Sequence, residues 1–100
     1  MILEMAVLNI VAGQDAEFER AMKSARPLIA ATPGFRGLTL RRCIETPNRY
    51  VLLVDWDSVE AHEIDFRKSE RYQEWRRLLH HFYEPKPVVE HYSANVLAPE

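Results

Sequence analysis

Both alternating sets of side chains are largely apolar in the first segment of the chain, MILEMAVLNIV. Its many Ile, Leu and Val residues, and its end at Gly13, predict a β-strand over residues 1–12. A strand with one face in water alternates apolar and polar residues, which neither this strand nor the later segment YVLLV (50–54) does. The sequence therefore requires a sheet that is covered on both faces.

A helix with one apolar face is expected to follow this strand. Its apolar positions recur at steps of four, three and four residues and are Phe18, Met22, Ala25 and Ile29. The spacing predicts a helix over residues 16–31 with Asp15 as its N-cap. Pro27 falls inside this helix, so we expect a kink or a separate last turn there.

The rest of the chain contains further strand and helix patterns. We expect two strands next, over residues 35–45 and 50–56, joined by a hairpin turn at Thr46-Pro47-Asn48. A short helix should follow, opened by Asp57 with Glu60 as a capping-box variant. The chain should end with a longer helix from Ser69 to about Phe82 and a strand over residues 88–97. The resulting order, βαββαβ, is that of ferredoxin-like folds. We therefore predict one α+β domain over residues 1–100, with a four-stranded antiparallel sheet and the helices on one face.

The second face of this sheet needs a cover of its own. At about 25 cal/mol per Å² of apolar surface, leaving some six such side chains in water would forfeit several kcal/mol, which is comparable with the stability of a small domain. The economical cover is a second copy of the same sheet, related by a two-fold axis. We therefore expect a homodimer whose sheets pack face to face.

Composition excludes several classes of function. The net charge of −2, with acidic and basic residues mixed, offers no surface for nucleic acid. No apolar run reaches the roughly 20 residues that span a membrane, and no leader pattern precedes the first strand. The single Cys43 forms no internal disulfide, which favours the cytoplasm. Glycine-rich phosphate loops, paired-cysteine zinc patterns and nucleophile elbows are missing from the sequence.

His62 is the first candidate for chemistry. It lies at helical spacing from Val59 and Phe66, so its imidazole faces the sheet and has the properties of a general base or proton donor near neutral pH. The competing interpretation is a core histidine bonded to a backbone carbonyl or to Asp65. His91, on the last strand, is a second candidate. Two histidines are able to hold a metal ion, but the spacing reveals no third ligand, so we expect none.

Aromatic residues accompany these histidines. Tyr72, Trp75, Leu79 and Phe82 recur at helical spacing, which fits either a core stripe or the wall of a pocket. The indole N–H of Trp75 needs a partner when buried, which favours a polar cavity beside it. Asn9 is polar within an apolar strand, so it either bonds to a neighbour or lines a ligand site.

The chain resembles the antibiotic biosynthesis monooxygenase family, small proteins of the dimeric α+β barrel type. The likeness rests on TPGFRG (32–37) leading into a strand, on YVLLVDWDSVEAH (50–62), and on the following helix that begins at Ser69. Members of this family include oxygenases that oxidise aromatic polyketide phenols to quinones without metal or flavin. Others degrade haem, and many have no known reaction.

The resemblance to the haem-degrading members is limited to layout. Those enzymes use an Asn on the first strand, a Trp and a His. Here Asn9 is displaced from the expected place, Asp65 stands where the Trp is expected, and Trp75 or Arg76 stands where the His is expected. Haem breakdown is therefore the least favoured of the family's activities.

The leading hypothesis is a cofactor-independent monooxygenase that oxidises a small electron-rich aromatic, such as a phenol or hydroquinone, with molecular oxygen. His62 is the expected base, and His91 or Asn9 orients the substrate. The expected walls of the pocket are Phe66, Tyr72 and Trp75. One alternative is a non-catalytic module that binds a small hydrophobic molecule; another is a filled core within a purely structural dimer.

Overall fold

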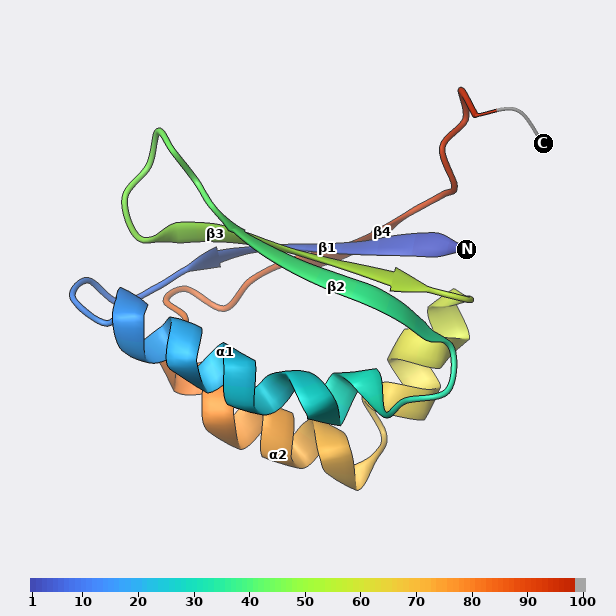
Figure 1. Ribbon diagram of the computed structural model, residues 1–100, viewed down its shortest axis with the longest axis horizontal. Coiled ribbons are helices and arrows are strands. Elements are labelled where there is room, and N and C mark those ends of the chain that lie inside the picture. Colours follow the sequence, from blue (N-terminus) through green and yellow to red (C-terminus); the bar gives the residue numbers. More distant parts are fainter. Residues whose placement is uncertain (99–100) are drawn as a thin grey trace.

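A four-stranded antiparallel sheet carries the helices on one face, as Figure 1 shows. The structure is a computed structural model and describes residues 1–98. Its elements are β1 (Ile2–Asn9), α1 (Asp15–Ala30), β2 (Phe35–Arg42), β3 (Arg49–Trp56), the π-helical turn η1 (Ala61–Phe66), α2 (Glu70–Leu79), the 3₁₀ turn η2 (His80–Phe82) and β4 (Val89–Tyr92). The predicted ferredoxin-like α+β fold is confirmed.

The strand order is β2-β3-β1-β4, so β1 lies between β3 and β4. Glu4 is level with Val54 on one side and with His91 on the other. Because side chains alternate between the faces of a strand, the even-numbered residues of β1 and β3 share one face. That face meets the helices, and Ala6, Leu8 and the even-numbered residues of β3 are buried on it.

The apolar face of α1 packs on the sheet as its spacing predicts. Its four buried residues are Phe18, Met22, Ala25 and Ile29. Two of the predicted details are wrong. Gln14 is the N-cap, and Asp15 is the first helical residue. The helix also continues through Pro27 to Ala30 and has no separate last turn, because a proline so near the C-terminus removes only one backbone hydrogen bond.

Three of the strands are shorter than the sequence predicts. β1 ends at Asn9 because the chain turns at residues 12–13, where Gly13 has φ +85°. β4 extends only over Val89–Tyr92, because its pairing with β1 covers just the stretch from Leu3 to Ala6. β2 likewise ends at Arg42.

The segment after β3 is built differently from the predicted capped helix. Ser58 caps it, since its Oγ accepts a hydrogen bond from the backbone N–H of Ala61 at 3.2 Å, whereas Asp57 bonds to Arg36. The turn η1 is π-helical, a form that is rare and frequent at functional sites. The N-cap predicted at Ser69 is confirmed, because its Oγ accepts from the N–H of Tyr72.

The face of the sheet that points away from the helices carries apolar side chains as well. They are Leu3, Met5, Val7, Val51 and Leu53, and each is half-buried or exposed. No helix covers this face within residues 1–98 (Figure 1). The described part of the chain therefore leaves an apolar sheet surface without a cover.

The turn at Gly34 generates a prediction about stability. Gly34 has φ +89°, and an added Cβ would lie 2.7 Å from the Cβ of Ala61. Gly34→Ala should lower the free energy of unfolding by about 3 kcal/mol, the sum of left-handed backbone strain and steric overlap. Gly13→Ala is the matched control, because Gly13 has φ +85° and open space, so only about 1 kcal/mol is expected. Urea unfolding measures both, and equal losses would contradict the close approach.

Candidate active site

A cavity of about 320 Å³ lies under the helix-facing side of the sheet. Residues of β1, β3, β4, all the helical elements and the segment before β4 line it. Its size is at the lower end of the range for small-molecule sites. Three exposed basic residues, Arg67, Arg76 and Lys86, also contribute to its lining. The cavity therefore fits a compact ligand, with apolar and aromatic walls on one part and basic side chains on another.

Of the described residues that line this cavity, one is acidic, and it is Glu4. Only 5% of its surface is exposed, and its Oε1 accepts a hydrogen bond from Nε1 of Trp56 at 2.8 Å. Burial raises the pKa of Glu4 to about 7, and the hydrogen bond from Trp56 opposes that rise. A carboxyl group with such a pKa exchanges protons readily near neutrality.

His62 lies on η1 and faces the sheet, as its spacing predicts. It is 4% exposed and stacks on the indole of Trp56, with ring centroids 5.4 Å apart. Its Nε2 lies 3.4 Å from Oε1 of Glu4, and it also lines the cavity. Burial lowers the pKa of His62 to about 4, so the imidazole is neutral at physiological pH. The acid beside its Nε2 is thus Glu4, not the Asp65 considered from the sequence.

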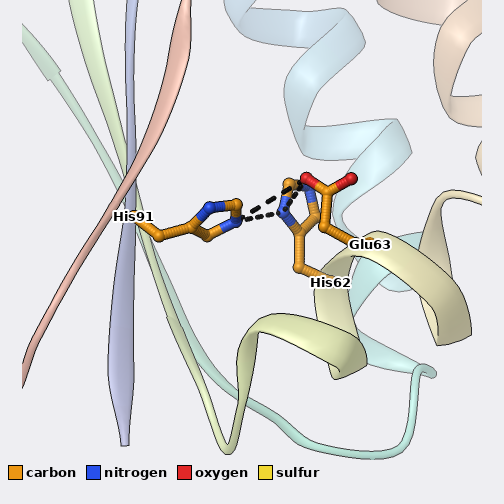
Figure 2. Close-up of side chains that lie close together, drawn as sticks. All are labelled: His62, Glu63 and His91. Carbon is orange, nitrogen blue, oxygen red and sulfur yellow. Dashed lines mark hydrogen bonds and ion pairs between the residues drawn. The ribbon is translucent and has the colours of Figure 1, made fainter.

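His91 meets His62 across the gap between β4 and η1. It is paired with Glu4 in the sheet register and therefore points toward the helices. Its Nε2 lies 2.9 Å from Nδ1 of His62 (Figure 2). Oε1 of Glu63 lies 3.6 Å from the same Nδ1 and 3.8 Å from Nε2 of His91. Two histidines and one carboxylate thus converge, an arrangement able to hold a metal ion.

The other sequence candidates divide into two groups. Phe66, Tyr72 and Trp75 line the cavity, and the ring of Phe66 meets those of Tyr72 and Trp75 edge to face. Asn9 does not line it. It occupies an odd-numbered position of β1, on the opposite face from Glu4, and its Oδ1 accepts a hydrogen bond from Nε of Arg49 at 3.0 Å.

Sequence reasoning missed Glu4 as a site residue. The signal was its even-numbered position, which it shares with the apolar residues Ala6, Leu8 and Ile10 of the first segment. An acid on the buried face of an otherwise apolar strand is rarely left without a partner. Glu63 was missed as well, because adjacent positions on a regular helix are not expected to reach the same point.

The sequence profile of the antibiotic biosynthesis monooxygenase family matches residues 1–78 of this chain. The chain therefore belongs to that family. YczJ of Bacillus subtilis (strain 168), an uncharacterized protein, is 45% identical over 93 residues, which cover 93% of this chain and 98% of YczJ.

Solved structures agree with this assignment. A protein from Bordetella bronchiseptica that is assigned to the same family is 40% identical, with a TM-score of 0.90, and the match covers 95% of this chain and 97% of that one. SnoaB of Streptomyces nogalater, a cofactor-independent oxygenase, is 22% identical with a TM-score of 0.79, over 99% and 97% of the two chains. At that identity SnoaB supports the fold alone.

None of the helices in residues 1–98 is both long and apolar enough to cross a membrane.

The contact between Trp56 and Glu4 generates a prediction. Trp56→Phe removes the indole N–H and leaves the buried carboxyl of Glu4 without this donor, which should lower stability by about 1–3 kcal/mol beyond the packing loss. A double-mutant cycle with Glu4→Leu, measured by urea unfolding, separates the two terms. Trp56→Phe should be less harmful in the Glu4→Leu background. Equal effects in both backgrounds would show that the hydrogen bond contributes nothing.

Proposed function

We propose that this protein oxidises a small electron-rich aromatic, a phenol or hydroquinone, with molecular oxygen in the cavity under the sheet. The observation that carries the proposal is the buried carboxyl of Glu4, held by Trp56 and facing an aromatic-lined space of ligand size. Membership of the antibiotic biosynthesis monooxygenase family supports the reaction class. SnoaB, a cofactor-independent oxygenase with the same fold, supports oxygen chemistry without a cofactor.

The substrate supplies the electrons in this proposal. Loss of the phenolic proton makes the ring electron-rich enough to pass an electron to oxygen. A phenol and one O₂ then give a quinone and one water: one oxygen atom bonds to the ring carbon opposite the hydroxyl, and the other leaves as water with two hydrogens from the substrate. A hydroquinone gives the quinone and hydrogen peroxide instead. Neither reaction needs an external reductant.

Glu4 takes the proton-accepting role in this scheme. The sequence favours His62 for that role, but Glu4 is the acid that lines the cavity, and Nε2 of the neutral His62 lies 3.4 Å from its Oε1. The rings of Phe66 and Trp75 would then pack on the substrate and exclude water, which strengthens the electrostatic interactions of the anion.

Oxygen uptake by the purified protein tests this proposal. A panel of hydroquinones, anthrones and flavonols should include a compound whose oxidation needs the protein. Glu4→Gln should lower that rate by about 10²–10⁴-fold, the typical contribution of a general base. Glu17→Gln, which changes an exposed carboxylate on α1, should leave it unchanged. Ligand binding without oxygen uptake would instead support a non-catalytic binding module, and a full rate in Glu4→Gln would remove Glu4 from the mechanism.

We also propose that two copies of the chain pack through the uncovered face of the sheet. The apolar side chains there lie on the central strands β1 and β3, and burying them yields about 25 cal/mol per Å². Light scattering at micromolar concentration should give twice the chain mass of 11.7 kDa. Leu53→Lys should shift the protein toward monomer, whereas Glu17→Lys, at an exposed position of helix α1 on the other side of the sheet, should not. A wild-type mass of one chain would refute the dimer.

A further inference from the structure

We propose that His62, Glu63 and His91 form a binding site for one divalent transition-metal ion, on the side of the His62 ring that faces away from Glu4. The three residues offer Nδ1, Oε1 and Nε2 respectively, and these atoms all lie within 4.8 Å of one another. Figure 2 shows the two imidazoles and the carboxylate converging from β4 and η1. The inference does not depend on the proposed oxidation.

The spacing of the three atoms suits a shared ion. Bonds of about 2.0–2.2 Å from a metal to nitrogen or oxygen place neighbouring ligand atoms roughly 2.9–3.5 Å apart. The corresponding distances here are 2.9 Å between the histidine nitrogens, and 3.6 and 3.8 Å from those nitrogens to Oε1 of Glu63. Only the carboxylate has to move, by a few tenths of an ångström. Glu63 is 40% exposed at its side chain, so this adjustment is unhindered.

The donor types select the class of ion. Two imidazole nitrogens and one carboxylate oxygen suit zinc, cobalt or ferrous iron, whereas calcium and magnesium prefer oxygen ligands throughout. The second oxygen of Glu63, Oε2, lies 3.5 Å from Nη1 of Arg67, so this contact leaves Oε1 for the ion. Three protein ligands leave at least one coordination position for water.

The location of the site connects the ion to the cavity. His62 and Glu63 belong to η1, and neither Glu63 nor His91 lines the cavity. An ion on Nδ1 of His62 requires the proton of that ring to reside on Nε2, which lies 3.4 Å from Oε1 of Glu4. The ion would therefore fix the tautomer of His62 and orient its N–H toward Glu4, as paired carboxylates do for metal-bound histidines elsewhere.

The ion would also fasten two parts of the fold. β4 is four residues long and is hydrogen-bonded in the sheet only to β1. A metal bond from His91 to η1 adds an attachment between this edge strand and the helical layer. Because the ion would bind the folded chain preferentially, it should raise the temperature of unfolding in proportion to the logarithm of its concentration.

The competing arrangement is a direct hydrogen bond between the two histidines. At 2.9 Å, Nε2 and Nδ1 need one proton between them, and an ion displaces that proton. If the two histidines only share a hydrogen bond, the protein binds no stoichiometric metal ion. If they hold an ion with Glu63, changing Glu63 or His91 should weaken its binding.

The test is metal binding by the full chain, freed of any tag and treated with a chelator. Calorimetry measures the binding of zinc, and visible absorption measures cobalt(II) bound in its place. We expect one ion per chain and a rise in the unfolding temperature. His91→Gln and Glu63→Gln should each weaken zinc binding at least tenfold. The matched controls are His81→Gln and Glu60→Gln, which change an exposed histidine and an exposed carboxylate outside the cluster and should bind as the wild type does.

Three results would overturn the site. They are the lack of stoichiometric zinc binding by the wild type, unchanged affinity in both His91→Gln and Glu63→Gln, and an equal loss in the two controls. Circular dichroism and unfolding without metal show whether each variant is folded. A variant that does not fold is replaced by His91→Asn or Glu63→Ala. Because no substrate is used, the outcome is independent of whether the protein consumes oxygen.

Discussion

The arrangement of the candidate site depends on one buried carboxyl group, that of Glu4 on the central strand β1. Burial of a carboxylate is unfavourable unless donors surround it. Here Trp56 donates to it from the adjacent strand β3, and the ring of His62 lies against both residues. The same register that aligns Glu4 with these partners places His91 beside it on β4. One position therefore links the sheet, the cavity and the histidine pair.

The sequence predicts the fold well because its signals are local. Short runs rich in Ile, Leu and Val identify the central strands, an apolar period of about 3.6 residues identifies α1, and side-chain caps such as Ser69 mark where a helix begins. The aromatic spacing of Phe66, Tyr72 and Trp75 likewise places them on one side of their helical segments, where they line the cavity. Element ends are predicted less accurately. β4 ends at Tyr92, where its pairing with Leu3 of β1 ends, and that partner lies far away in the sequence.

The details of the site could not be derived from the sequence in the same way. Whether Asn9 or Glu4 faces the cavity depends on the parity of β1, and both faces of that strand are apolar enough to conceal it. The pairing of His62 with His91 depends on strand register. The contribution of Glu63 depends on the π-helical turn, whose backbone hydrogen bond joins the N–H of Arg67 to the carbonyl of His62.

The most direct measurement is a crystal structure of the protein with a bound bromophenol, in which the anomalous signal of bromine fixes the orientation of the ring. The account predicts that the ring lies between Phe66 and Trp75 and that its hydroxyl oxygen is about 3 Å from the carboxyl group of Glu4. A ring bound elsewhere, or a hydroxyl group directed away from Glu4, would contradict the assignment of this cavity as the site of oxidation.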